Sequence, residues 1–412
     1  MWRLLRGNRD FRLLYAGTLI SLGGDWFLTV ALLDLVLSLT GSATLASLML
    51  LCQTLPIFFI TPLAGHVVDR VDRRKLMIAV DLVRAVACLL PLLARTPATL
   101  PFAYAGVILI SIGSAYFEPA SQAALPNLVR DEELGPANVL MGSTWGTMLA
   151  VGAGIGGLVT ARFGRDVSFV VDAVSFLASA GILALMRARF SEGAPASSPA
   201  AAGRRQSSRR DGGAPLLDSI RETLQYAKDH PRVLALLTSK GGYGLGAGVV
   251  AMLSVFGKEV FRAGAFGIGL LFAARGLGAL FGPFIVRAVS ARDDLQYRLT
   301  SLCVIVFGAG YIGLGLAHSL VVGATAIFLA HLGGGAQWQT STYGLQREVP
   351  DRIRGRVFAA DYGFVTLTMA VSSLAAGILS DRFGPAAATI TVASLAVCWG
   401  LFWGTWTWKL WR

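Results

Sequence analysis

Apolar residues fill the chain in twelve long runs, which short polar or glycine-containing segments separate. An α-helix rises about 1.5 Å per residue, so about 20 apolar residues in helical conformation cross the hydrocarbon core of a bilayer. Segments such as Thr40 to Ser42 are short, which makes neighbouring helices antiparallel hairpins. We therefore predict an all-α polytopic membrane protein with helices at residues 13–38, 43–66, 75–95, 100–122, 137–161, 166–187, 232–257, 266–290, 297–317, 320–345, 357–380 and 385–408.

The distribution of Lys and Arg predicts the orientation of these helices. Of the 36 basic residues, 27 fall in alternate segments that include both termini, six fall in the opposite set, and three lie within predicted helices. Cytoplasmic segments of membrane proteins carry the excess of Lys and Arg, so we expect both termini in the cytoplasm and the chain in the plasma (inner) membrane. The first apolar run is too long for a cleavable signal and reads as the first transmembrane helix.

Composition agrees with this assignment and excludes other classes. The chain is 54% hydrophobic and 15% charged, with a mean hydropathy of +0.62. The net charge of +12 lies in short loops between apolar runs and not on one soluble face, so no nucleic-acid partner is expected. The four cysteines lie within apolar runs at unrelated spacings, so we expect no metal and no cofactor; they are Cys52, Cys88, Cys303 and Cys398.

A segment rich in Pro, Gly, Ser and Ala divides the chain into two halves of six helices. Residues 190–215 are too poor in apolar side chains to fold, and their basic cluster either contacts anionic lipid heads or belongs to a simple flexible tether. Residues 216–229 then predict a short amphipathic helix. We expect an N-terminal bundle at 1–189, a cytoplasmic linker at 190–230 and a C-terminal bundle at 231–412.

The two halves align with each other at an offset of 220 residues. The clearest match is Gly157…Arg162-Phe163-Gly164 with Gly377…Arg382-Phe383-Gly384, in the same connection of each half. Further identities are Leu14 with Leu234, Gly24 with Gly244, Gly113 with Gly333, Leu125 with Leu345, Val129 with Val349, Asp131 with Asp351 and Gly135 with Gly355. Two parallel repeats of this kind are typical of transporter folds.

A charged turn between the second and third helices reads Gly65-His66-Val67-Val68-Asp69-Arg70-Val71-Asp72-Arg73-Arg74-Lys75. It resembles the signature loop of the major facilitator superfamily, which in that family helps to latch the cytoplasmic side between transport states. The matching residues are Gly65, Asp69, Arg70, Arg73, Arg74 and Lys75. Asp72 stands where the family has glycine, and we expect it to cap the helix that begins near Arg73. The alternative interpretation is a solvated, positively charged cytoplasmic loop.

The fifth predicted helix contains Gly152-Ala153-Gly154-Ile155-Gly156-Gly157. This stretch resembles the antiporter motif Gly-Pro-x-x-Gly-Gly of the superfamily's exporters, with Ala153 in place of proline. Its candidate residues are Gly152, Gly154, Gly156 and Gly157, since glycines let helices approach closely and bend. Ordinary packing of small residues is the alternative.

Three further stretches resemble one branch of the superfamily. They read Phe11-Arg12-Leu13-Leu14…Gly24-Asp25-Trp26, Tyr116-Phe117-Glu118-Pro119-Ala120 and Val349-Pro350-Asp351…Arg354-Gly355-Arg356-Val357. The branch is that of drug and siderophore exporters, which includes macrolide efflux proteins and enterobactin exporters. The resemblance covers nearly the whole chain apart from the linker, and it implies the major facilitator fold of two six-helix pseudo-repeat bundles and a monomer.

Ionisable side chains deep in the bilayer are candidates for function because they are costly there. Asp25 lies 13 residues past Arg12, about 20 Å into the membrane, and Arg275 lies midway between Arg262 and Arg287. We hypothesise that Asp25 is a proton-coupling carboxylate in a central cavity, with Arg275 as a possible partner from the other half. Desolvation favours a neutral carboxyl and a nearby cation favours the charged form, so hydration of the cavity would move the proton. A purely structural role for either residue is the alternative.

Other polar residues within the predicted helices have less distinct roles. His331 and Gln53 are similarly deep; His331 either relays protons or is a satisfied interior histidine, and Gln53 is a candidate to line the cavity. Lys240 is shallow enough to extend toward the cytoplasmic surface. Asp81 and Arg84 are three residues apart, so we expect a local ion pair.

Three more carboxylates, Glu118, Asp172 and Asp361, lie nearer the membrane surfaces, where we expect structural pairing. Asp34 is expected close to the outer surface.

The sequence contains neither a GxxxxGK[ST] phosphate loop nor an HExxH motif, so we expect no enzyme. We expect a secondary active transporter that exports a drug-like or siderophore-like small molecule by alternating access, with protons as the coupling ion and the lipid bilayer as its environment. The alternatives are a metabolite importer, a lysophospholipid flippase and a transporter-like membrane sensor.

Overall fold

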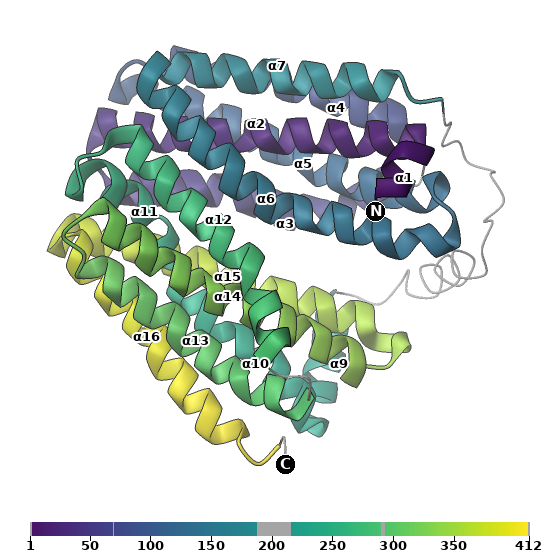
Figure 1. Cartoon of the computed structure of the whole chain (residues 1–412), viewed down its shortest axis with the longest axis vertical. Helices are drawn as coiled ribbons and strands as arrows, with labels where there is room; N and C mark the ends of the chain where they lie inside the picture. Colours follow the sequence, from purple (N-terminus) through teal and green to yellow (C-terminus); the bar gives the residue numbers. More distant parts are fainter. Residues whose placement is uncertain (1, 69, 188–215, 290–292, 411–412) are drawn as a thin grey trace.

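The computed structural model describes residues 2–68, 70–187, 216–289 and 293–410, and within these ranges the regular secondary structure is helical (Figure 1). The N-terminal bundle consists of α2 (Arg9–Thr40), α3 (Ala43–Val68), α4 (Arg73–Ala87), α5 (Pro101–Leu128), α6 (Asp131–Phe163) and α7 (Arg165–Ala184). The C-terminal bundle consists of α10 (Pro231–Gly246), α11 (Met252–Val255), α12 (Gly264–Val289), α13 (Asp293–Gly315), α14 (Leu320–Glu348), α15 (Asp351–Phe383) and α16 (Pro385–Thr407). Two short helices, α1 (Trp2–Gly7) and α9 (Leu216–Asp229), precede the bundles.

Twelve helices or end-to-end helical segments in the described ranges are long and apolar enough to cross a membrane. Short irregular helical turns extend α4 to Leu93, and they join α10 through α11 to Val260, so each of these two sets makes one crossing. The twelve predicted crossings are therefore confirmed. Many apolar side chains remain exposed, such as Val86 at 68% and Val321 at 72%, as expected of helices that face lipid.

The local sequence explains where several helices begin and end. The Asn8 side chain accepts a hydrogen bond from the Phe11 N–H at 3.0 Å and starts α2, while Gly41 ends it in the left-handed region. Asp72 starts α4, because its carboxylate accepts a hydrogen bond from the Lys75 N–H at 3.1 Å. The predicted capping role of Asp72 is confirmed.

The expected internal repeat has a structural counterpart in two glycines. Gly164 ends α6 with φ 91° and ψ 164°, and Gly384 ends α15 with φ 88° and ψ 157°. The Gly164 N–H donates to the carbonyl oxygen of Thr160 at 3.0 Å, and the Gly384 N–H donates to that of Ser380 at 2.9 Å. The same backbone turn therefore joins the fifth helix to the sixth in each half, as the offset of 220 residues requires.

The two bundles lie side by side (Figure 1), and packing between them uses a few helices. In the N-terminal bundle α2 is central: it packs on α6 and α7, and its residues from Leu28 to Leu37 are mostly inaccessible. Between the bundles α6 packs on α12, and α3 packs on α15. We call the end that carries both termini and α9 the terminal end, and the opposite end, near α11, the far end.

Only the second part of the predicted linker, from residue 216 onward, lies within the described residues. Residues 188–215, which contain the segment expected to stay unfolded, lie outside the described residues. The short helix predicted at 216–229 is present as α9.

We predict that Gly164→Ala and Gly384→Ala each lower the stability of the purified protein by about 1–3 kcal/mol, because their backbone conformation is open essentially only to glycine. Equilibrium unfolding in detergent micelles measures this difference. Gly181→Ala is the matched control, since Gly181 lies within α7 with open space around it and should tolerate a side chain. Equal effects at all three positions would contradict the proposed role of the turns.

Candidate functional site

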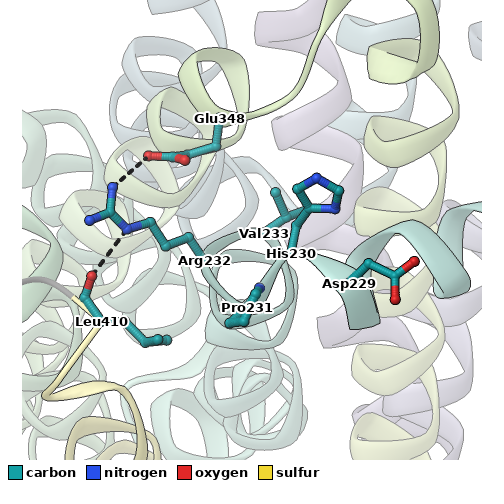
Figure 2. Close-up of a pocket in the computed structure, with 7 residues that line it drawn as sticks. All are labelled: Asp229, His230, Pro231, Arg232, Val233, Glu348 and Leu410. Atoms are coloured by element: carbon teal, nitrogen blue, oxygen red, sulfur yellow. Dashed lines mark hydrogen bonds and ion pairs between the residues drawn. The ribbon is translucent and has the colours of Figure 1, made fainter.

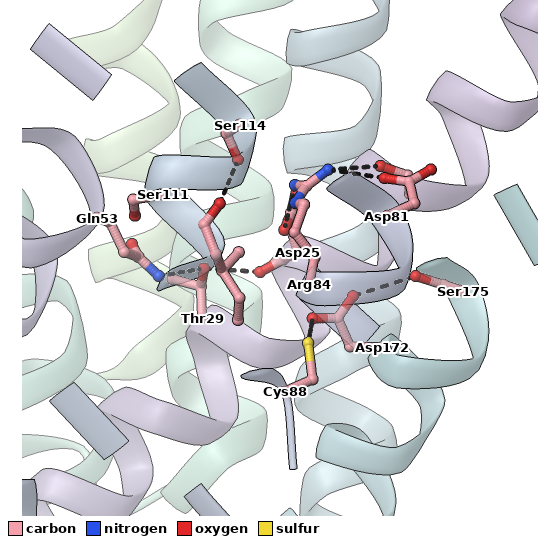
Figure 3. A network of polar contacts seen from close by, with 12 residues as sticks. Asp25, Thr29, Gln53, Asp81, Arg84, Cys88, Ser111, Ser114, Asp172 and Ser175 are labelled. Atoms are coloured by element: carbon pink, nitrogen blue, oxygen red, sulfur yellow. Dashed lines mark hydrogen bonds and ion pairs between the residues drawn. The ribbon is translucent and has the colours of Figure 1, made fainter. Parts of the chain in front are cut away.

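A buried group of charges lies inside the N-terminal bundle, where α2, α4 and α7 meet (Figure 3). The Arg84 Nη2 atom lies 3.0 Å from Asp25 Oδ2, and Arg84 Nη1 lies 3.3 Å from Asp81 Oδ1. Asp172 lies beside them on α7 (Figure 3). We call Asp25, Asp81, Arg84 and Asp172 the carboxylate cluster. The expected local pair between Asp81 and Arg84 is confirmed, and Arg84 bridges to Asp25 as well.

Aromatic rings hold Arg84 in this position. Its guanidinium carbon lies 4.0 Å from the ring centre of Phe176 and 5.7 Å from that of Phe117. Its side chain is only 3% exposed, whereas the Asp25 side chain is 25% exposed. Asp25 is therefore the member of the ion pair that reaches accessible space.

Asp172 is buried and is hydrogen bonded by neutral donors. The Cys88 thiol lies 3.0 Å from its Oδ2, and the Ser175 hydroxyl donates to its Oδ1 at 3.1 Å (Figure 3). A Cβ atom at Gly24 would overlap both Asp172 and Ser175. Glycine at position 24 therefore lets the polar face of α7 approach α2 beside Asp25.

The cluster holds more negative than positive groups. Three carboxyls lie around one guanidinium, which pairs with two of them, so full ionisation would leave a net charge of −2. Uncompensated charge is costly inside a membrane bundle, which suits the cluster to hold an exchangeable proton. No group of His, Cys, Asp and Glu in the described ranges is arranged to bind a metal ion.

Gln53 connects α3 to the segment of α2 next to this cluster. Its Nε2 atom donates to the Thr29 hydroxyl at 3.0 Å, and that hydroxyl donates to the Asp25 carbonyl oxygen at 2.7 Å. Gln53 thus lies one helical turn from the Asp25 side chain (Figure 3).

Arg275 lies at the interface between the bundles and does not join the carboxylate cluster. Its guanidinium carbon is 5.7 Å from the Trp145 ring centre on α6 and 5.9 Å from that of Phe272 on α12. Asp25 pairs with Arg84, so the suggested pair between Asp25 and Arg275 is absent from this structure. The prediction failed because the sequence does not specify which way each helix faces.

His331 lies in the interior of the C-terminal bundle. Its Nε2 atom is 2.8 Å from the Tyr311 hydroxyl, and the ring packs edge-on against Phe307. These contacts hold the imidazole within the protein, as expected of the second alternative, an interior histidine.

Lys240 contradicts its sequence-based prediction. It is 2% exposed, forms an ion pair with Asp361, and lies 4.5 Å from the ring centre of Trp338. The side chain therefore turns into the C-terminal bundle instead of extending toward the surface, because a partner carboxylate is available on α15. The structural pairing expected of Asp361 is confirmed.

The charged turn between α3 and α4 makes contacts within its own bundle. Arg73 donates to the Ala123 carbonyl of α5 at 2.9 Å, and Arg74 donates to the Leu183 carbonyl at 3.0 Å and to that of Ala184. A cation suits the Arg74 site because the carbonyls at the end of α7 carry partial negative charge.

The other predicted members of this turn are less constrained. Arg70 is exposed, Gly65 lies near the end of α3, and the Lys75 N–H forms the capping bond of α4. Asp69 lies outside the described residues.

The glycine motif of α6 faces two different helices. Gly152 and Gly156 lie against Gly23 and Phe27 of α2, in the same bundle. On α12 of the other bundle, Gly154 lies near Ala273, and a Cβ atom at Gly157 would lie 2.7 Å from the Gly269 Cα atom. The motif therefore sets how closely the two bundles pack.

Polar contacts join the bundles at the far end. The Asp381 carboxylate, at the end of α15, accepts hydrogen bonds from the Ser42 hydroxyl at 2.8 Å and from the N–H groups of Ala43 at 2.7 Å and Thr44 at 3.1 Å. The Lys258 ammonium lies 2.5 Å from Asp34 of α2. Asp381 therefore caps the start of α3 from the opposite bundle.

A surface pocket of about 360 Å³ lies at the terminal end, where α10 begins (Figure 2). Arg232 lines it, with Nη1 3.7 Å from Glu348 and Nε donating to the Leu410 carbonyl at 3.1 Å. The remaining lining residues are Asp229, His230, Pro231 and Val233. The pocket belongs to the C-terminal bundle and contains none of the predicted site residues.

Sequence reasoning missed Arg84 as the partner of Asp25 and Asp172 as a neighbour. One pattern in the sequence points to Asp172: Ser168, Asp172, Ser175 and Ser179 recur at intervals of three or four residues and form one face of α7. All four are buried. A polar stripe along an otherwise apolar helix indicates an interior network.

Comparisons with known proteins agree with this architecture. The model of the transmembrane secretion effector family matches residues 4–407. The MFS-type transporter YfiS of Bacillus subtilis is 26% identical, over 97% of this chain and 93% of its own. Macrolide efflux protein A of Streptococcus pyogenes is 34% identical over 32% of each chain.

The solved structures support the fold. A bacterial homologue of the human lysosomal transporter Spinster, in an inward-facing and unoccupied conformation, superposes with a TM-score of 0.74. It is 14% identical, and the match covers 96% of each chain. The likeness concerns the fold.

We predict that Gly157→Ala separates the bundles at the far end, because the new Cβ atom would meet the backbone of Gly269 and Ala265. Spin labels on exposed positions 163 and 266, at the far ends of α6 and α12, should report longer distances in this variant. The native cysteines are replaced by serine for this measurement. Gly142→Ala, on the same helix with open space around it, is the control. Unchanged distances in Gly157→Ala would show that the motif does not set the packing.

Proposed function

The chain belongs to the transmembrane secretion effector family of the major facilitator superfamily, and on this basis we propose that it is a proton-coupled exporter. In this proposal it works in the inner membrane as a monomer. It exports a drug-like or siderophore-like small molecule by alternating access between its two bundles. The observation that carries the proposal is the carboxylate cluster, in which Arg84 pairs with Asp25 and Asp81 while Asp172 lies beside them and bonds to neutral donors.

The cluster supplies the chemistry that proton coupling needs. Binding one proton would change the net charge of the fully ionised cluster from −2 to −1. Arg84 would then have one fewer carboxylate to neutralise. Asp25 is suited to exchange this proton because its side chain is the one that reaches accessible space, while it remains bonded to Arg84. Because Asp25 lies on α2 and Arg84 lies on α4, a change in that bond would act on both helices.

Contacts between the bundles support alternating access. Asp381 and Lys258 tie the bundles together at the far end, while Arg73 and Arg74 of the charged turn bond to helices of their own bundle. We propose that this structure is the state closed at the far end, and that the charged turn contacts the opposite bundle in the other state. Hydrogen bonds of exposed side chains are weak enough to exchange during such a change.

The distribution of basic residues supports the orientation. The terminal end carries most of the Lys and Arg, which favours both termini in the cytoplasm and makes the far end the outer end. The export direction draws on the efflux function named for the Streptococcus pyogenes relative.

We predict that Asp25→Asn abolishes protonophore-sensitive efflux of a fluorescent dye that energised cells expel through the wild-type protein. Asparagine keeps the size of the side chain and an acceptor for Arg84, but it cannot exchange a proton. The measurement is the rate of dye loss at equal membrane expression. Asp166→Asn is the matched control, because this carboxylate pairs with Arg95 on the exposed surface and should be dispensable.

Each result of this experiment has a distinct meaning. Efflux that the protonophore stops but that survives in Asp25→Asn would keep the exporter and remove Asp25 from the proton step. Failure of wild-type cells to export any tested dye or drug would contradict export and favour import, lipid transport or sensing.

A further inference from the structure

At the interface between the bundles, two buried side-chain N–H groups have no hydrogen-bond acceptor in the part of the chain that the structure describes. Arg275 keeps only 8% of its surface exposed, and its Nε atom is buried with no hydrogen-bond partner. The indole Nε1 atom of Trp26, on α2, is likewise buried and unpartnered. Buried donors without acceptors are rare in proteins, and each such group points to a partner that is absent.

The same aromatic rings surround both donors. The Trp26 ring lies 6.3 Å from Trp145 and 6.2 Å from Phe272 between ring centres, and these two rings are the ones that flank Arg275. Trp145 is 46% exposed, so one side of this group opens to accessible space. We call Trp26, Trp145, Phe272 and Arg275 the Arg275 site.

The chain provides no counter-charge for Arg275 within the described residues. Two carboxylates within the predicted membrane helices are engaged elsewhere, Asp25 with Arg84 and Asp361 with Lys240. His331 is bonded to Tyr311 through its Nε2 atom, and an imidazole carries no negative charge. A cation buried without an anion is costly, and an aromatic ring face offsets only part of that cost.

We propose that the Arg275 site binds the anionic group of the transported molecule. The ligand would be an amphipathic organic anion, such as an aromatic carboxylate. Its negative oxygens would accept from Arg275 and from Trp26, and its flat apolar part would pack against Trp145. This proposal rests on the proposed export function and names the substrate class that the site selects.

The position of the site gives it a role in coupling the two halves. Trp26 and Trp145 belong to the N-terminal bundle, whereas Phe272 and Arg275 belong to the C-terminal bundle. A bound anion would therefore contact both bundles at once. Trp26 directly follows Asp25 in α2, so the ligand would also contact the helix that carries the proposed proton site.

Equilibrium dialysis of the purified full chain in detergent tests this site with three molecules that share a naphthalene ring and differ in charge. They are 1-naphthoate, neutral 1-naphthamide and cationic 1-naphthylmethylammonium. We expect naphthoate to bind about tenfold more tightly than the amide, as one charge-assisted hydrogen bond allows, and the cation to bind weakest. Arg275→Gln should remove this preference, and Arg275→Lys should keep part of it.

Two further variants keep the test decisive if Arg275→Gln fails to fold. Trp26→Phe keeps the ring but removes the donor, and it should weaken naphthoate binding more than amide binding. Arg95→Gln removes one exposed positive charge elsewhere and should leave the preference unchanged, which separates a local site from net charge.

Equal binding of the three molecules to the wild-type protein would overturn the proposal. A preference for naphthoate that persists in both Arg275→Gln and Trp26→Phe would also overturn it. Binding is measured without any gradient, so its outcome does not depend on export: selective binding without efflux would fail the proposed function and keep the anion site.

Discussion

Charge that is buried within a membrane bundle is costly unless it is compensated, and this constraint acts most clearly through Arg84. The bilayer offers neither water nor counter-ions, so the guanidinium needs carboxylates from neighbouring helices. Arg84 finds them on α2 and on its own helix, and it is enclosed by Phe176 of α7. This one side chain thus fixes how three helices of the N-terminal bundle face one another. The buried cluster around Arg84 still holds more carboxyls than cations.

The two bundles share a fold but differ in their charge balance. The interior of the C-terminal bundle pairs Lys240 with Asp361 and leaves Arg275 without an anion among the described residues, whereas the buried carboxylate cluster of the N-terminal bundle has carboxyls in excess. The two imbalances have opposite sign and lie on either side of the interface where α6 meets α12. We infer that a proton neutralises part of the negative excess and that a substrate anion neutralises Arg275, which would couple the movements of the proton and the substrate.

Much of the fold was predictable from the sequence because it depends on local patterns. The twelve crossings follow from the length of apolar runs, the cap at Asp72 follows from residue type, and the repeated turn at Gly164 and Gly384 follows from the internal match. The depth of Asp25 in the membrane was also predictable, because the position of a residue along a helix follows from counting residues. These properties need no knowledge of how one helix is rotated against another.

The contacts between helices were not predictable in the same way. Arg275 was considered as a partner for Asp25, but Arg84 takes that place, and Lys240 turns inward to Asp361. In each case the partner is decided by helix rotation and by which small residues, such as Gly24, permit close approach. The most direct test of the account is proton counting in proteoliposomes that contain a pH-sensitive dye, with an imposed gradient of a compound that cells export through this protein. We expect the compound to drive protons in the opposite direction through the wild type and not through Asp25→Asn; movement of the compound without any proton movement would contradict the account.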